Sequence, residues 1–241
     1  MRVDVVLTPA AAIPTALAGC TALVIDVLRA STTMVTALAN GCRAVVPVAE
    51  VDEARRRVAA MPGALLAGER GGDPPEGFDL GNSPLEFTRE RVDGRTIVFT
   101  TSNGTRALIA ARPATAVGVA GFANLSAAAE WALGQGRSIV LVCAGELGAR
   151  SAEDEVCAGL LVERVLSRQG GAVAGPAAVE AAAAGRRYAK DLARLGQDSL
   201  HARRLVAKGR GPDVAACLTL DGFALVPIYR ADIDKVVSPY R

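Results

Sequence analysis

The fold is decided by one stretch of the chain, Ala22-Leu23-Val24-Ile25-Asp26-Val27-Leu28-Arg29-Ala30-Ser31-Thr32-Thr33. Residues 22–26 are an apolar run ending in an acid, which is typical of a buried strand. Residues 32–40 have helical periodicity, with Gly41 as a C-terminal stop. A strand that passes through a short polar loop into a helix is the repeating unit of an α/β protein, and the first turn of such a helix can bind an anion through its backbone N–H groups. The stretch therefore predicts an architecture and a ligand site.

The same alternation of apolar runs and helical stretches continues along the chain. Further strands are predicted at residues 3–7, 44–48, 96–100, 116–120, 138–144 and 224–228. Further helices are predicted at residues 51–60, 104–111, 125–133, 152–167, 177–184 and 199–208, and the capping-box pattern Ser83-Pro84-Leu85-Glu86 predicts another. We expect a single α/β domain over residues 1–241, built as a three-layer α/β/α sandwich with a mostly parallel sheet.

Two parts of the chain echo each other. Residues 22–57 and 96–131 each run strand, polar loop, helix, strand, helix. A duplicated half explains this echo, and generic α/β alternation explains it about as well. The sequence leaves open whether the domain is built from two similar halves.

Composition excludes several classes of protein. Hydrophobic residues make up 51% of the chain and aromatic ones 4%, which favours a core of Ala, Val and Leu between helices and a parallel sheet. A net charge of +2 gives no field to attract nucleic acid, and no apolar run reaches the ~18 residues of a membrane span. The five cysteines lack zinc or disulfide spacing, so we expect a reduced, cytoplasmic protein in which Cys20, Cys42, Cys157 and Cys217 are packing residues. Symmetric assembly is common among soluble enzymes, which favours a homo-oligomer.

Polar segments follow four of the predicted strands, where ligands bind in open α/β sheets. They cover residues 26–33, 68–84, 100–106 and 143–155. Ordinary capped helices would explain each of the first three segments singly. Together, these three anion-friendly loops favour a phosphate site.

The residue types in these segments suggest a division of roles. Carboxylates supply the hard oxygen ligands that magnesium needs, and the predicted metal set is Asp26, Glu69, Glu153 and Asp154, with Asp79 a further oxygen donor. Arginine matches an oxyanion bidentately, so Arg29 and Arg70 are predicted to bind the phosphate or sulfonate. With three of the carboxylates they form the predicted catalytic set: Asp26, Arg29, Glu69, Arg70 and Asp154. The predicted substrate contacts are Ser31, Thr32, Gly71, Gly72, Asp79, Asn82, Thr101, Asn103, Gly104, Thr105 and Ser151.

Several phosphatase mechanisms and nucleotide motifs are excluded. A cysteine phosphatase needs Arg six positions after its Cys, but Cys143 is followed by Arg150, one residue too late. An aspartyl-phosphate enzyme of the haloacid dehalogenase type needs Asp at position 28, which is Leu28 here, and no P-loop or dinucleotide fingerprint is present. The single histidine, His201, lies in a basic helix, where we expect a surface position rather than a phosphohistidine or zinc ligand.

Taken in order, these segments resemble the 2-phosphosulfolactate phosphatase family. The likeness lies in residues 26–33, 68–72, 77–84, 100–105, 153–154 and 158–159, and more loosely in residues 213–227. The resemblance implies magnesium-dependent hydrolysis of 2-phospho-3-sulfolactate to 3-sulfolactate and phosphate, as on a route towards coenzyme M.

Alternatives from two other classes stay open. One is a magnesium-dependent phosphatase for another small acidic phosphate ester, and the other is a non-catalytic module that binds an organic phosphate. The acids Asp26, Glu69 and Asp154 favour a hydrolase, because a pure anion binder has little use for carboxylates beside its ligand. Attack by water and a phosphorylated aspartate both remain open.

Overall fold

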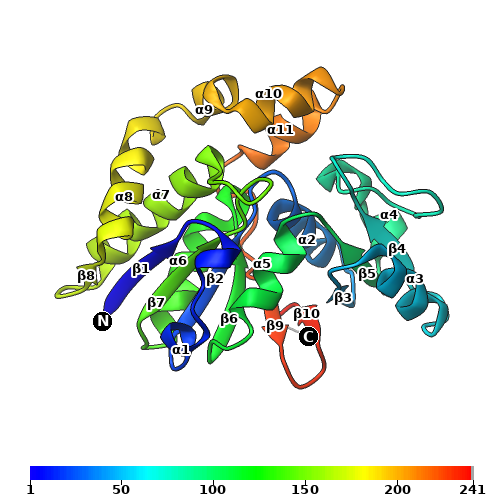
Figure 1. The fold of residues 1–241 in the computed structure, drawn as a ribbon, viewed down its shortest axis with the longest axis horizontal. Coiled ribbons are helices and arrows are strands. Elements are labelled where there is room, and N and C mark those ends of the chain that lie inside the picture. Colours follow the sequence, from blue (N-terminus) through cyan, green and yellow to red (C-terminus); the bar gives the residue numbers. More distant parts are fainter. Residues whose placement is uncertain (240–241) are drawn as a thin grey trace.

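The computed structural model describes residues 1–239 and contains a ten-stranded sheet (Figure 1). In spatial order the strands are β4 (Leu65–Gly68), β5 (Thr96–Thr100), β3 (Ala44–Pro47), β10 (Lys235–Val237), β9 (Ile228–Arg230), β6 (Ala116–Ala120), β2 (Thr21–Ile25), β7 (Ile139–Cys143), β1 (Arg2–Val6) and β8 (Val173–Ala174). The β9–β10 hairpin pairs antiparallel with β6 and β3, and the other pairings are parallel. The predicted mostly parallel sheet is confirmed.

Helices surround this sheet. The longer ones are α2 (Ala30–Ala39), α3 (Val51–Ala59), α5 (Gly104–Ala111), α6 (Leu125–Gly134), α7 (Ala152–Arg168), α8 (Pro176–Tyr188), α9 (Leu192–Asp198), α10 (Leu200–Ala207) and α11 (Gly211–Cys217). Short pieces are α1 (Pro14–Leu17), α4 (Arg89–Val92) and the 3-10 turns η1 (Pro9–Ala11), η2 (Pro84–Glu86) and η3 (Phe122–Asn124). Within residues 1–239, no helix combines the length and the apolar character that crossing a bilayer requires.

The core lies on both faces of the sheet. Successive side chains of β2 alternate: Leu23 and Ile25 pack in a cluster with α6, α7 and α8, while Ala22 and Val24 pack in a second cluster with α2 and α5. Strand β2 is buried along its whole length because helices cover both of its faces. The central part of the molecule therefore has the three layers that the sequence predicted.

The strand order is consistent with two similar halves. Strands β3 and then β5 lie outward from the β9–β10 hairpin on one side, and β6 and then β2 on the other. The unit β2-α2-β3 is thus related to β5-α5-β6 as by a two-fold axis through the hairpin. The two helix starts are similar but not identical: Asp26 N–H donates to Ser31 Oγ, five residues on, at 2.9 Å, and Thr101 N–H donates to Thr105 Oγ1, four residues on, at 3.2 Å. The strand order is therefore consistent with a duplicated half.

Two local predictions are wrong, and the strands β4, β8 and β10 were not predicted. The segment 83–86 forms only the turn η2, because Ser83 Oγ donates to Asp213 and Glu86 accepts from Gly81 N–H in place of a capping box. The last strands are β9 and β10 rather than residues 224–228. Strand β4 was missed because Leu65–Gly68 contains no β-branched or aromatic residue, and β8 and β10 are only two and three residues long.

The C-terminal helices cover one end of the molecule. Helices α9, α10 and α11 lie at the end opposite the β9–β10 hairpin (Figure 1). Just past the end of α10, Lys208 Nζ donates to the carbonyl oxygen of Gly71 at 2.6 Å, in the loop that follows β4. Helix α10 is therefore held against the loop at the carboxyl end of β4.

Gly159 in α7 and Gly185 in α8 form a close helix crossing that gives the first prediction. A β-carbon at Gly159 would overlap the carbonyl oxygen of Ala181 in α8. We expect Gly159→Ala to lower the free energy of unfolding by about 1–3 kcal/mol, because the two backbones must separate. Urea denaturation measures this loss. Gly134→Ala is the matched helical control, since a β-carbon there meets nothing, and an equal loss in both variants would contradict the crossing.

Candidate active site

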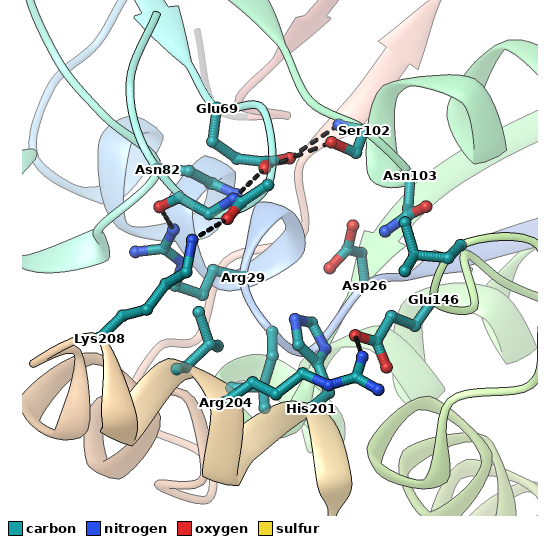
Figure 2. Close-up of a pocket in the computed structure, with 15 residues that line it drawn as sticks. Asp26, Arg29, Glu69, Asn82, Ser102, Asn103, Glu146, His201, Arg204 and Lys208 are labelled. Carbon is teal, nitrogen blue, oxygen red and sulfur yellow. Dashed lines mark hydrogen bonds and ion pairs between the residues drawn. The ribbon is translucent and has the colours of Figure 1, made fainter.

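A pocket of about 180 Å³ lies at the carboxyl ends of β2, β4 and β5, against α10 (Figure 2). Seven of the residues predicted from the sequence line it: Asp26, Arg29, Glu69, Gly71, Gly72, Asn82 and Asn103. The other residues predicted for the site lie outside this lining, and several of them hold its loops in place. The sequence analysis did not select the lining residues Ser102, Glu146, Arg204 and Lys208.

Asp26 is the most unusual acid of the pocket. It is 6% exposed, its Oδ1 accepts from Ala30 N–H at 3.3 Å, and its Oδ2 accepts no hydrogen bond from the described residues. A side chain at Gly104 would overlap Oδ2, so this glycine lets α5 approach the carboxylate. Burial raises the pKa of Asp26 to about 7 against the attraction of His201, with the charges of Glu69 and Glu153 adding to the rise.

Glu69 joins two loops of the pocket. Its Oε1 accepts from Ser102 N–H at 2.7 Å, and its Oε2 accepts from Gly72 N–H at 2.8 Å. The carboxylate at the end of β4 thus fixes the glycine-rich loop against the start of α5. Both of its oxygens are engaged by backbone donors.

Asp154 performs a similar task behind the pocket. Its Oδ1 accepts from Val27 N–H at 2.8 Å and its Oδ2 from Gly145 N–H at 3.0 Å, while Ser151 Oγ caps α7 by accepting from Asp154 N–H. Burial raises the pKa of Asp154 well above its usual range, and the nearby charge of Asp26 adds to the rise. The side chain ties the loop after β2 to the loop after β7.

The two predicted arginines are placed differently. Arg29 lines the pocket and is buried in an ion pair with Asp213 at 2.6 Å, and it also donates to the carbonyl oxygen of Gly72. Arg70 lies outside the lining, and its guanidinium donates to the carbonyl oxygens of Glu69 and Ala49 and to Thr100 Oγ1. Arg70 therefore fixes the end of β4 to the neighbouring strand ends.

The remaining predicted contacts support the backbone around the pocket. The hydroxyls of Ser31, Thr101 and Thr105 hydrogen-bond within the helix starts described above, and Thr32 Oγ1 donates to the carbonyl oxygen of Val27. Asp79 Oδ2 accepts from Leu66 N–H at 2.8 Å, at the edge of the sheet.

Helix α10 brings three basic side chains that sequence reasoning did not assign to the site. His201, Arg204 and Lys208 lie at positions i, i+3 and i+7, which places them on one helix face, and all three line the pocket. This i, i+3, i+7 spacing is visible in the sequence and could have indicated a basic helix face at the site. Arg204 Nη1 donates to Glu146 Oε1 at 2.6 Å. His201 is not the surface residue we expected: its side chain is 19% exposed and faces the pocket (Figure 2).

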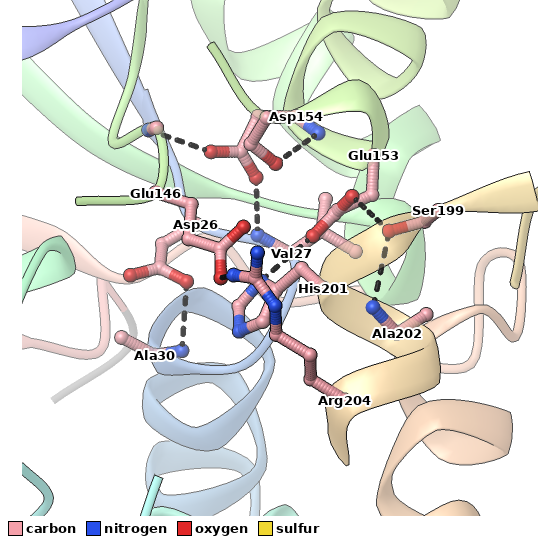
Figure 3. A network of polar contacts seen from close by, with 12 residues as sticks. Asp26, Val27, Ala30, Glu146, Glu153, Asp154, Ser199, His201, Ala202 and Arg204 are labelled. Carbon is pink, nitrogen blue, oxygen red and sulfur yellow. Dashed lines mark hydrogen bonds and ion pairs between the residues drawn. The ribbon is translucent and has the colours of Figure 1, made fainter. Parts of the chain in front are cut away.

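His201 is held by a buried acid. Its Nδ1 lies 2.9 Å from Glu153 Oε1, and Glu153 Oε2 accepts from Ser199 Oγ at 2.8 Å (Figure 3). Burial alone would lower the pKa of His201, but the hydrogen bond and charge of Glu153 outweigh it, so the pKa is raised. Burial alone would raise the pKa of Glu153, and His201 brings it below its usual range. The two side chains are therefore placed to form an ion pair when the imidazole is protonated.

Of the four predicted metal ligands, three have both carboxylate oxygens engaged: Glu69, Glu153 and Asp154. Across residues 1–239, no group of three or more His, Cys, Asp or Glu side chains is arranged to hold a metal ion. A cage made only of protein ligands is therefore absent from the described part of the chain.

These observations define an α/β protein with a pocket of charged side chains at the carboxyl ends of its strands, where open α/β sheets bind ligands. A family model described as 2-phosphosulpholactate phosphatase matches residues 6–232. The chain belongs to this family of phosphoric monoester hydrolases.

Two curated relatives illustrate the likeness. A protein of Thermotoga petrophila is 41% identical over 229 residues, which cover 93% of this chain and 94% of the relative. A protein of Gloeobacter violaceus is 40% identical over 230 residues, which cover 94% of each chain. Both are named "Probable 2-phosphosulfolactate phosphatase".

The raised pKa of Asp26 gives a second prediction. Since its folded pKa of about 7 exceeds that of an unfolded aspartate, the ionised side chain destabilises the fold above pH 7, and this penalty fades as the pH falls towards 4. In chelator, Asp26→Asn should melt roughly 5 °C or more above the wild type at pH 8. The gain should shrink at pH 4.

Thermal melts at the two pH values measure this difference. Asp52→Asn, at an exposed carboxylate on α3, is the matched control and should leave both melting temperatures nearly unchanged. An Asp26→Asn variant that melts below the wild type at pH 8 would contradict the buried, destabilising carboxylate.

Proposed function

We propose that this protein hydrolyses 2-phospho-3-sulfolactate to 3-sulfolactate and phosphate, with magnesium. The observation that carries the proposal is the Asp26 carboxylate, with one oxygen available, in a pocket bordered by cationic side chains. The names of the relatives support the substrate. A buried acid of raised pKa is costly for a simple anion binder, so it favours catalysis over capture.

The cationic side chains suit an ester with several acidic groups. Arg29, His201, Arg204 and Lys208 border the pocket, against the acids Asp26, Glu69 and Glu146. In 2-phospho-3-sulfolactate, phosphate, sulfonate and carboxylate lie within a few bonds of one another. A small pocket with several cations can therefore contact more than one of these groups at once.

Asn82 supplies an additional polar contact. It is 4% exposed and lines the pocket, yet its Oδ1 has no hydrogen-bond partner among the described residues. Buried polar groups are nearly always paired, so an unpaired one in a pocket favours a bound ligand or water. Because the two ends of a carboxamide can exchange by a flip, Asn82 can donate to an acidic oxygen of the substrate.

The residues present fit a magnesium ion shared between protein and substrate. Magnesium usually takes one or two carboxylates and fills its other positions with water and phosphate oxygens. We narrow the proposed ligands to Asp26, with Glu146 as a second carboxylate of the same pocket. When bound, the ion would neutralise charge on the phosphoryl oxygens. Arg29 and the N–H groups at the start of α2 would orient the ester for attack by water.

The third prediction tests the activity. The wild type should release phosphate from 2-phospho-3-sulfolactate with magnesium, and chelator or Asp26→Asn should lower kcat/KM at least about 100-fold. A phosphate-release assay on a panel of small esters measures both. Equal turnover of 2-phospholactate, which lacks the sulfonate, would favour a phosphatase for another acidic ester. Full activity in chelator would exclude magnesium.

The fourth prediction contrasts two asparagines. Asn82→Ala should lower kcat/KM for the sulfonated ester about ten- to hundredfold with little loss of stability, because its side chain makes no hydrogen bond within the described fold. Asn40→Ala should lower the stability and leave kcat/KM nearly unchanged, because Asn40 Nδ2 donates to the carbonyl oxygen of Phe87 at 2.7 Å, away from the pocket. Steady-state kinetics and thermal melts of both variants measure this. A destabilised Asn82→Ala variant with normal kinetics would exclude the ligand contact.

A further inference from the structure

His201 has the surroundings of a proton donor rather than of a structural histidine. One ring nitrogen, Nδ1, is taken by Glu153 Oε1 at 2.9 Å, and the other, Nε2, has no partner among residues 1–239. Figure 2 shows the ring between α10 and Asp26, inside the pocket. An imidazole that is oriented through one nitrogen presents the other to a ligand in a fixed direction.

The acid that orients His201 is itself fixed. Glu153 is 1% exposed in the first turn of α7, and its second oxygen accepts from Ser199 Oγ, which also caps α10 by accepting from Ala202 N–H at 3.1 Å. The same contacts that begin α10 therefore set the angle of the imidazole. The hydrogen bond and charge of Glu153 favour the protonated ring, which carries a proton on each nitrogen.

Acids from three neighbouring elements favour the protonated ring. Glu153 belongs to α7, Glu146 to the loop after β7, and Asp26 to the loop after β2. The cation Arg204, on the same helix, is paired with Glu146. The imidazolium is thus stabilised from three sides and can act on a ligand in the pocket.

We propose that His201 is a catalytic residue that donates the Nε2 proton to the ester oxygen as that oxygen leaves phosphorus. This inference deepens the phosphatase function proposed above and rests on it. Glu153 is the positioning residue that holds the ring and keeps it protonated. The alcohol of a secondary alkyl ester is a poor leaving group, so protonating its oxygen removes a large part of the barrier.

The step balances as follows in atoms and charge. Water forms the new O–P bond, the ester O–P bond breaks, and its electron pair stays on the departing oxygen, which takes the proton from Nε2. The attacking water keeps one proton in hydrogen phosphate and gives up the other to solvent. Solvent then returns a proton to the neutral imidazole, so the enzyme is unchanged over one turnover.

The kinetic test uses the quality of the leaving group. His201→Gln should lower kcat/KM for 2-phospho-3-sulfolactate about 100-fold or more, but for 4-nitrophenyl phosphate less than about tenfold, because nitrophenolate leaves without a proton. Glu153→Gln should move the alkaline limb of the pH profile to lower pH, since the imidazole loses its charged partner. Arg203→Gln, exposed on the same helix, is the matched control and should behave like the wild type. Equal losses on both esters would overturn the proposal.

A second readout does not depend on turnover. His201 is the only histidine of the chain, so its imidazole gives a single set of NMR signals in the untagged protein. Inorganic phosphate should shift the Nε2 signal and raise the pH at which the ring titrates, because the anion contacts that nitrogen. An Nε2 signal that phosphate leaves unmoved would overturn the role of His201 even in an active phosphatase. A wild type that binds phosphate at Nε2 but hydrolyses no ester would instead contradict the proposed function.

Discussion

The site depends on the hydrogen bonds made by two carboxylates in the first turn of α7. Asp154 accepts backbone N–H groups from Val27 and Gly145, and its neighbour Glu153 binds Ser199 and His201. Two consecutive carboxylates therefore hold the loop after β2, the loop after β7 and the start of α10. Since both belong to one rigid turn of a 17-residue helix, these three parts of the pocket cannot shift independently.

Glu153 and Asp154, together with Asp26, concentrate negative charge in the buried region behind the pocket. Burial raises the pKa of Asp26 and of Asp154. The charge of Asp26 raises the pKa of Asp154 further, and the charges of Glu69 and Glu153 raise the pKa of Asp26. The ion pairs of Arg29 with Asp213 and of His201 with Glu153 offset part of this repulsion. Breaking a buried pair on one side leaves an unpaired charge, so the network is more sensitive to single substitutions than an apolar core of the same size. Repulsion between buried charges of this kind is common at sites that bind or transform charged ligands.

The two-fold arrangement of the halves explains the place of the pocket. Gly104 at the start of α5 packs against Asp26, which accepts from Ala30 N–H at the start of α2, so both helix starts reach one carboxylate. The C-terminal helices lie outside these two similar units, and they add the basic face of α10 to one side of this meeting point. The pocket is therefore asymmetric, although the strands and helices beside it follow a two-fold arrangement.

The sequence by itself determined most of the strands and helices that surround the pocket, and the loops that line it, because local periodicity and glycine-rich strand ends are visible without the fold. Asp26, Arg29, Glu69 and Asn82 were found in this way. It did not place His201, about 175 residues after Asp26 in the chain, in the pocket, and it did not distinguish Arg29, which lines the pocket, from Arg70, which does not. Which guanidinium faces the pocket, and which carboxylate keeps an oxygen available, depends on backbone donors that come from distant segments. Only the tertiary structure decided these points, because hydrogen-bond partners across the sheet leave no trace in local sequence.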